Sequence, residues 1–444
     1  MSIRPSLYRV LTIKKDGKTV DFRLAATSID FYEDVLCPTV SCTIQIANSG
    51  GAIKSDESGK YVSLYEGMKL RKGEEVELYI QSNSATNQDL DYATKRSLFV
   101  NDITELIRDD RAEFFKLHLF SKEAYMNEMV FLEKKYGEST RISDHVETII
   151  NESFQSSIEK DIDTTSVNYG FWGSQMKPFE AIMKLASKAN SEGSLNSSTA
   201  GPSSAGFFFY QTRRGFAFKS IDNLVAQSVD VPKYVYTEYN GSPVDFKPRG
   251  DLISLDYKIN HFVINQAGSL SEDLRKGVIA SARRFFDPVS FNVTVDNIFS
   301  QDDYGTIPTL GERISEETPK LGNIDLSKFP TKIITETFDK GTANPEVSTK
   351  NNLDQTLYSS QRKMRYNSLF AQSVSIQVPL NTNLHAGDLI DCVFASIGDS
   401  DLPEPDRTQI SGIYMIKELC HHYDPRTSYT SMMLTRDTYG ERQK

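Results

Sequence analysis

The sequence of 444 residues has little cysteine, little histidine and no long apolar run. Its four cysteines form neither a tight disulfide framework nor a zinc-binding pattern: Cys37, Cys42, Cys392 and Cys420. No segment approaches the about 18 apolar residues of a membrane-spanning helix, and no apolar signal core follows Met1. We therefore expect free thiols in a reducing compartment, a core that needs no disulfide or metal, and no membrane partner.

The sequence also lacks an excess of positive charge. Its formal net charge is -10, from 60 acidic and 50 basic residues. A protein that grips nucleic-acid phosphates would instead show a basic patch or stripe. A mildly acidic surface repels phosphate, so the composition remains compatible with a wall past which DNA slides.

Motifs of known chemistry are missing as well. The chain has no phosphate loop, dinucleotide-binding turn, nucleophile elbow or zinc-protease helix. Cys420 stands beside His421 and His422, but neighbouring residues of a strand point to opposite faces and cannot easily share one ion. We therefore expect no metal and no cofactor.

Two acidic pairs are the best candidates for catalysis. Asp109–Asp110 and Asp302–Asp303 could in principle serve glycoside hydrolysis, which uses paired carboxyl groups. Both pairs lie in polar stretches with no apolar surroundings to raise a carboxyl pKa. We expect solvated turn carboxylates and no catalytic residue, which favours a structural or assembly role.

The periodicity of apolar residues changes along the chain. Period-two runs typical of strands occur near both ends, as in Val40–Ile46 and Val374–Val378. Helical spacing occurs over Ile142–Ile158 and again from Pro178, a good first-turn residue. The pattern predicts an α+β, mainly β fold in which two β-rich end domains flank a mixed α/β domain.

Four segments follow from these changes. Residues 1–130 are expected to form a first β-barrel domain, because many short strands at close spacing are typical of a barrel or sandwich. Residues 131–230 are expected to form an α/β domain with two helices and an aromatic hairpin. Residues 231–352 are β-rich and contain a long, polar, extended excursion. Residues 353–444 are expected to form a second β-barrel domain, completed by strands from 231–300.

A spaced pattern near the start returns near the end. Gly73 and an acidic residue open one strand-like run, and Gly387 and Asp388 open another. Two further strand-like runs follow each of them at nearly the same intervals. The alternatives are two related β-barrels that flank a mixed middle domain or two unrelated β-meanders that look alike.

An aromatic hairpin dominates the middle of the chain. Phe207, Phe209 and their neighbours are apolar on both faces of one strand, which then needs cover on both faces. We expect the two helices and a neighbouring domain to supply the cover, with Trp172 in the same α/β domain. Arg213–Arg214 at the hairpin turn either bind carboxylates of a partner or remain solvated.

Acidic residues also occur on the predicted strands. Alternation places Glu75 and Glu77 on one face of their strand, and Asp388 and Asp391 belong to the equivalent run near the end. They either line a channel, where they would repel DNA, or point outward as solvated carboxylates.

Several of these segments resemble the baseplate hub proteins of contractile-tailed, myovirus-like bacteriophages. The likeness rests on a Trp- and Pro-bearing loop that opens a helix, on the aromatic hairpin, and on a closing β domain with a Gly-Asp turn. The segments that carry it are Gly170–Ile182, Gly206–Asp222, Ala371–Pro379, Asn383–Ile390 and Gly412–Ile416.

The resemblance implies a homotrimer in which each subunit supplies two tube-like β-barrel domains. Six similar barrels would then match a sixfold tail tube protein on one side and a threefold central spike protein on the other. It further implies contacts with baseplate wedge proteins, transient passage of DNA, no enzyme activity, and a place in the virion tail after assembly in the bacterial cytoplasm. The alternatives are a tail-associated cell-wall hydrolase and the hub of a related bacterial contractile injection machine.

Overall fold

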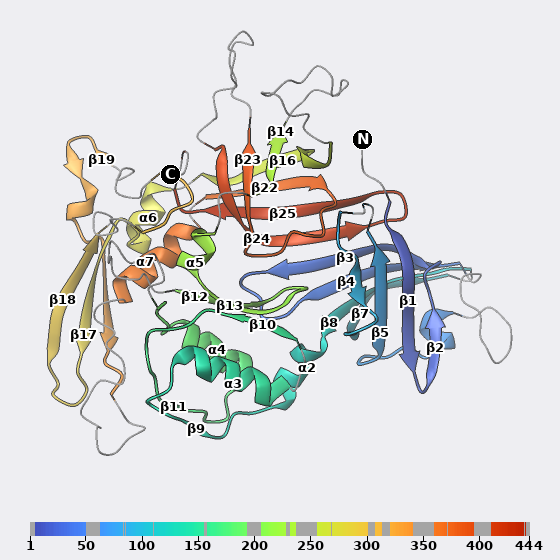
Figure 1. Cartoon of the computed structure of the whole chain (residues 1–444), viewed down its shortest axis with the longest axis horizontal. Helices are drawn as coiled ribbons and strands as arrows, with labels where there is room; N and C mark the ends of the chain where they lie inside the picture. Colours follow the sequence, from blue (N-terminus) through green and yellow to red (C-terminus); the bar gives the residue numbers. More distant parts are fainter. Residues whose placement is uncertain are drawn as a thin grey trace, which may run out of the picture.

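The computed structural model of the chain confirms the mainly β class (Figure 1). Helices gather in the middle of the sequence, and strands dominate both ends. The structure describes residues 5–49, 63–82, 84, 86–109, 111–154, 158–192, 206–227, 231–236, 255–267, 269–300, 307–312, 320–340, 359–370, 372–394, 410–438 and 440.

Six strands in one hydrogen-bonded order make up what we call the N-terminal repeat. Their alternating apolar residues, such as Cys42, Ile44 and Ile46 of one strand, face a shared core. The order is β1 (Leu7–Lys15), β5 (Glu75–Gln81), β7 (Leu98–Arg108), β8 (Glu113–Ser121), β4 (Ser41–Asn48) and β3 (Ala26–Asp34). Three short elements accompany them: β2 (Lys18–Asp21), α1 (Leu64–Gly67) and β6 (Leu90–Tyr92).

Six later strands repeat this order and make up the C-terminal repeat. The order is β14 (Lys233–Tyr236), β23 (Leu389–Val393), β24 (Gly412–Tyr423), β25 (Ser428–Arg436), β22 (Gln372–Pro379) and β16 (His261–Ala267). Both β14 and β16 come from the segment before residue 300. The repeats differ at one end, because β14 runs parallel to β23 whereas β1 runs antiparallel to β5.

The backbone confirms that the two glycines of the spaced pattern are equivalent. Gly73 and Gly387 have φ angles of 87° and 89°, a left-handed conformation that favours glycine. The Gly73 N–H donates to the carbonyl of Val100 at 2.7 Å, and the Gly387 N–H donates to the carbonyl of Ile416 at 2.8 Å. In return, the Val100 N–H donates to the carbonyl of Glu74 and the Ile416 N–H donates to the carbonyl of Asp388, both at 2.9 Å.

A β-bulge lies at the same point of both repeats. The pairing of β7 with β8 shifts by one residue between Val100 and Asp102. The pairing of β24 with β25 shifts between Ile416 and Glu418. Strand order, glycine turns and bulges therefore all match, which favours two related β domains over two unrelated meanders.

The two repeats are joined edge to edge. The second half of β24 pairs antiparallel with β3, from Glu418 opposite Asp34 to Tyr423 opposite Ile29. This seam makes one continuous sheet from both ends of the chain, seen in Figure 1 where the blue and red strands meet. Pairing among the described strands does not close either repeat into a barrel of its own.

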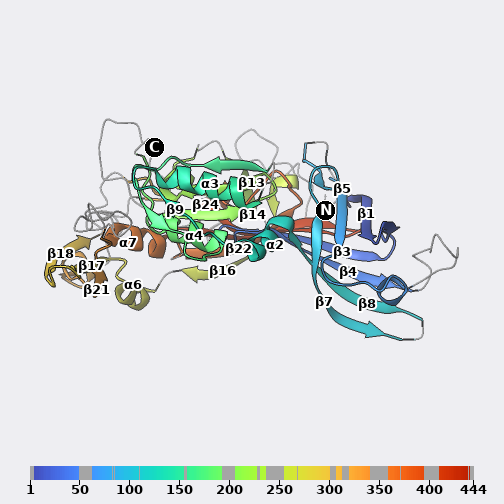
Figure 2. The same ribbon diagram turned by 90° about the horizontal axis from the view of Figure 1, so that it is seen from below.

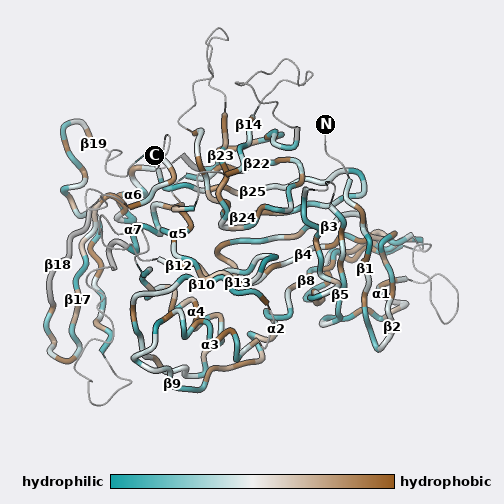
Figure 3. Tube along the Cα trace, viewed as in Figure 1, coloured by the Kyte–Doolittle hydropathy of each residue, from teal (hydrophilic) through white to brown (hydrophobic). Residues whose placement is uncertain are grey.

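The α/β unit packs below this sheet in Figure 1. Helices α3 and α4 cover one face of a three-stranded sheet and bury the apolar stripes that predicted them, which Figure 3 shows as brown segments. The unit comprises α2 (Lys122–Met129), β9 (Lys135–Tyr136), α3 (Ile142–Phe154), β10 (Glu159–Ile162), β11 (Phe171–Trp172), α4 (Pro178–Ala186), β12 (Phe207–Gln211), β13 (Gly215–Ser220) and α5 (Ile221–Val225).

Strand β12 is buried on both faces. Phe207 and Phe209 pack into the core under α3 and α4. Phe208 and Tyr210 pack into a separate core formed with the C-terminal repeat. The hairpin thus connects the α/β unit to the large sheet, and this explains why both of its faces are apolar.

Trp172 is not part of this aromatic core. Its side chain is 59% exposed, on the short ladder of β9 with β11. Its neighbour Phe171 stacks on Tyr136 with ring centroids 4.4 Å apart. Because successive strand residues point to opposite faces, Phe171 takes the inward position and Trp172 the outward one.

The polar segment before residue 352 is more ordered than the sequence suggested. Residues 320–340 belong to the expected extended excursion, but within them β21 pairs in parallel with β17 along its whole length. The sequence did not predict this strand because one of its faces is exposed and carries few apolar residues. The region comprises η1 (Leu255–Tyr257), β15 (Lys258–Ile259), α6 (Leu270–Lys276), β17 (Ala280–Phe286), β18 (Val293–Ser300), β19 (Lys320–Leu321), β20 (Ile324–Asp325), η4 (Leu326–Lys328), β21 (Lys332–Thr337) and α7 (Ser359–Leu369).

Candidate functional site

The turn of the aromatic hairpin inserts between the two repeats. The guanidinium of Arg213 donates to the carbonyl of Asp89 at 3.0 Å and to the side chain of Gln88 at 2.8 Å, both in the N-terminal repeat. It also donates to the carbonyl of Thr382 in the C-terminal repeat at 2.8 Å. One side chain therefore connects three units, as the fixed fork of arginine allows.

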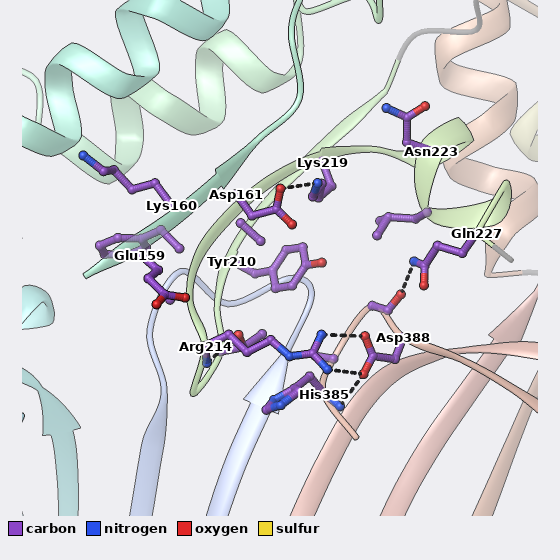
Figure 4. A pocket seen from close by; sticks show the side chains of 17 residues that line it. Glu159, Lys160, Asp161, Tyr210, Arg214, Lys219, Asn223, Gln227, His385 and Asp388 are labelled. Carbon is purple, nitrogen blue, oxygen red and sulfur yellow. Dashed lines mark hydrogen bonds and ion pairs between the residues drawn. The ribbon is translucent and has the colours of Figure 1, made fainter. Parts of the chain in front are cut away.

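The neighbouring arginine makes the carboxylate contact that the sequence left open. Arg214 forms an ion pair with Asp388 at 3.2 Å, and Figure 4 shows the two side chains facing each other. Arg96 of the N-terminal repeat donates to the carbonyls of Arg213 and Arg214, at 3.2 Å each. The carboxylate belongs to the same chain, so these arginines stabilise the junction of the units.

A buried carboxylate lies under the turn. Glu33 of β3 accepts hydrogen bonds from the backbone N–H of Arg213 at 2.6 Å and of Ala386 at 3.1 Å. His385 Nδ1 lies 3.2 Å from each of its two oxygens. Glu33 is 1% exposed. Its donors come from the hairpin turn and from the C-terminal repeat, while the carboxylate itself belongs to the N-terminal repeat, so all three units meet at this group.

These surroundings fix the charge states at the junction. Burial alone would raise the pKa of Glu33, but His385 and the backbone donors outweigh it and hold that pKa below its usual value. Burial lowers the pKa of His421, which lies close by on β24, to about 3. The folded junction therefore contains an ionised Glu33 and a neutral His421.

Acid is expected to destabilise the chain through His421. Below about pH 6.5 the unfolded chain binds a proton there that the folded chain does not bind, so stability falls as the pH is lowered towards 3. The contribution of one group is at most about 1.4 kcal/mol per pH unit. Denaturant titrations between pH 7.5 and 5 should give a shallower pH dependence for His421→Gln than for the wild type. Equal slopes would contradict the assignment.

The sequence-predicted residues at the second glycine turn converge on this junction. A Cβ atom on Gly387 would lie 2.3 Å from the hydroxyl of Tyr210, so the turn needs glycine for space as well as for its φ angle. Asp388 accepts a hydrogen bond from the backbone N–H of His385 at 3.0 Å. Burial raises the pKa of Asp388. Asp391 lies opposite Lys233 in the ladder of β23 with β14.

Glu75 and Glu77 lie away from the junction, on the outer face of β5. They share one face, as alternation predicted, and both are half-buried. Lys14 of β1 forms ion pairs with both of them. Positive charge therefore accompanies the acidic residues of this face.

A cavity of about 450 Å³ opens beside the junction (Figure 4). Strand β10 supplies Glu159 and Asp161, and the turn at 385–388 forms the opposite wall. Lys219 forms an ion pair with Asp163 at 3.0 Å and another with Asp161. The charged groups of the cavity thus balance one another.

Metal binding gains no support from the histidine pair. His421 points inward to Thr430, with Nδ1 and Oγ1 3.0 Å apart, while His422 contacts Asp30 on the other face at 2.5 Å. Among the described residues no three His, Cys, Asp or Glu side chains are placed to hold an ion.

The acidic pairs considered for catalysis are only partly described. Asp109 caps a turn, whereas Asp110, Asp302 and Asp303 lie outside the described residues. Within the described part of the chain no helix is long and apolar enough to span a membrane.

Sequence reasoning missed Glu33 and Arg96. One signal was available for Glu33, because Ile29, Phe31 and Glu33 share one face of a strand and a charge on an apolar face needs a partner. Arg96 lies in a polar loop, where no pattern distinguishes it from a solvated charge.

No protein-family model matches the sequence, and no curated protein matches it. Solved structures do. The 43 kDa tail protein of prophage MuSo2 from Shewanella oneidensis has a TM-score of 0.50 at 8% identity, covering 96% of this chain and 99% of that one. The tail protein of Neisseria meningitidis MC58 has a TM-score of 0.49 at 9% identity, covering 96% of both chains. The E. coli c3393 protein, a component of the type VI secretion system, has a TM-score of 0.41 at 10% identity, covering 98% of this chain and 79% of that one.

The fold of the chain is therefore that of a phage tail protein, along nearly its whole length. The resemblance to phage tail hubs inferred from the sequence is confirmed at the level of the fold.

Proposed function

We propose that this chain is the baseplate hub of a contractile phage tail. Three copies form a ring that joins the sixfold tail tube protein to the threefold central spike protein, contacts the baseplate wedge proteins and lets DNA pass on ejection. The chain works as a structural component of the virion and not as an enzyme.

The observation that carries this proposal is the repeat within the chain. Two halves with one strand order, matching glycine turns and matching bulges are joined edge to edge by β3 and β24. Three such chains supply six similar units, so a threefold ring can present near-equivalent contacts to a sixfold tube. Closed cyclic symmetry is the usual way to satisfy repeated contacts without open-ended growth.

The junction supports the same role. Arg213, Arg214 and Glu33 hold the hairpin turn against both repeats, which favours a fixed arrangement of the three units. A rigid ring subunit needs fixed angles between its wall segments, whereas a hydrolase needs an accessible pair of reactive groups.

Native mass spectrometry of the purified protein tests the proposal. We expect a mass of three times the 50.0 kDa chain. A turbidity assay on bacterial cell walls should show no lysis, with a lysozyme as the positive control. Monomers or dimers alone at all concentrations would overturn the trimer, and lysis would favour a tail-associated hydrolase.

A further inference from the structure

The internal seam joins β3 to β24. Their counterparts in the other repeat are β16 and β7, and among the described residues each of these has a strand edge that pairs with no other strand. The edge of β3 that faces away from β4 pairs with β24, but no strand among the described residues pairs with the matching edge of β16. Likewise the second half of β24 pairs with β3, but no described strand pairs with the matching part of β7, from Asp102 to Ile107. Figure 2 shows β7 and β8 extending away from their repeat, and β16 on the C-terminal repeat.

We infer that these two edges pair with each other between copies of the chain. The second half of β7 in one subunit forms an antiparallel ladder with β16 of the next subunit, repeating in the assembly the seam that β24 and β3 form within the chain. This inference rests on the proposed ring and names the surface that closes it.

The apolar residues of the two edges support this contact. Ile107 is 67% exposed and Leu106 42%, both on β7. Val263 is 45% exposed and Ile264 43%, both on β16. An open strand edge with exposed apolar side chains is a template for pairing with another chain. These residues occupy the two edges that the repeat would bring together.

The repeat fixes which residues would lie opposite each other. Ile107 of β7 lies opposite Phe114 of β8, and His422 of β24 lies opposite Tyr429 of β25. Phe114 and Tyr429 occupy the same position in the two repeats, so Ile107 corresponds to His422. Val263 corresponds to Asp30 by the same comparison of β16 with β3. His422 and Asp30 lie opposite each other in the internal seam and contact at 2.5 Å. Ile107 would therefore lie opposite Val263.

The bulges of the two strands provide an independent match. Strand β7 has one extra residue between Thr104 and Ile107, where Glu105 has a left-handed φ of 52°. Strand β16 has one extra residue between Ile264 and Gln266. In the proposed ladder the extra residue of β7 lies opposite the extra residue of β16. The two bulges therefore compensate each other, and the pairing continues in register on both sides.

The resulting ladder matches in polarity. Apolar residues meet apolar residues, and polar residues meet polar residues, at the centre of the seam. The pairs are Ile107 with Val263, Leu106 with Ile264, Glu105 with Asn265, and Thr104 with Gln266. Direct cross-strand pairs of this kind stabilise sheets. Because the contact is head to tail, it needs two different edges per chain and closes only as a ring.

Cysteine cross-linking between separate chains tests the seam. One chain carries Ile107→Cys and the other Val263→Cys, and the two are mixed, assembled and mildly oxidised. We expect a disulfide-linked dimer on a non-reducing gel. Wild type under the same conditions gives the background of its four native cysteines. A mixture of Ile107→Cys with Asn265→Cys is the register control, because diagonal Cα atoms lie roughly 7–8 Å apart, too far for a disulfide.

Charge variants test the same pair without oxidation. Ile107→Glu with Val263→Glu should lose the oligomer in native mass spectrometry, whereas Ile107→Lys with Val263→Glu should retain it. An oligomer of wild type without the cross-link between positions 107 and 263, or with equal cross-linking in the register control, overturns the seam and leaves the proposed function standing. A wild-type chain that remains monomeric overturns the proposed function itself.

Discussion

Truncating Glu33 to alanine is expected to destabilise the folded chain by roughly 3–5 kcal/mol, the usual cost of removing one partner from a buried charged network. The carboxylate is fully buried and accepts from the backbone of Arg213 and Ala386 as well as from His385. Without it these donors stay buried with no side-chain acceptor. Denaturant unfolding followed by tryptophan fluorescence and circular dichroism measures the change.

Two control variants separate the network from a general effect of losing a carboxylate. Glu77→Ala removes a half-buried carboxylate that pairs with Lys14 on the outer face and should cost about 1 kcal/mol or less. Glu33→Gln keeps an acceptor oxygen and should fall between the wild type and Glu33→Ala. A loss below about 1 kcal/mol for Glu33→Ala would show that the junction does not depend on this carboxylate.

Truncating Phe209 to alanine is expected to cost roughly 3–5 kcal/mol as well. Its ring is 4% exposed and lies between Phe216, with centroids 5.5 Å apart, and Phe179, at 5.7 Å. The helices α3 and α4 pack over this face of the hairpin, so the cavity could close only if both helices moved. Thermal and denaturant unfolding of the purified variant check the value.

Trp172 supplies the matched control for Phe209. It belongs to the same unit and is also a large aromatic residue, but its side chain is mostly exposed. Trp172→Ala should therefore change stability by less than about 0.5 kcal/mol. Equal losses for the two variants would mean that the aromatic core is not the main support of the α/β unit.

Local patterns in the sequence predicted many elements of this fold correctly. Alternation marked strands near both ends of the chain, such as β4 and β22, helical spacing marked α3 and α4, and the doubly apolar run at Phe207 required cover on both faces. The glycines at 73 and 387 carried the repeat, because a left-handed φ is tolerated by few other residues. Each of these signals depends on the residue itself or on neighbours within one turn or one strand.

Long-range pairing could not be predicted in this way. Strand β21 has one exposed face and little apolar content, so its place beside β17 depends on a partner about fifty residues away. Trp172 and Phe171 differ in exposure only because the β9–β11 ladder fixes which of them points inward. In β21 and in β11 alternate side chains point to opposite faces, as in any strand. Only the partner strand decides which of these faces is turned towards the core.

The sequence by itself therefore determined the mainly β class, a spaced glycine pattern shared by the two ends of the chain, and the absence of recognised catalytic motifs. The tertiary structure alone decided that the repeats share one sheet through β3 and β24, that Arg213 and Arg214 hold three units together, and which strand edges remain open. The physical reason is that hydrogen bonds between strands join backbone groups, which every residue carries. Sequence patterns show which face of a strand is buried, but they do not show which strand lies at its edge.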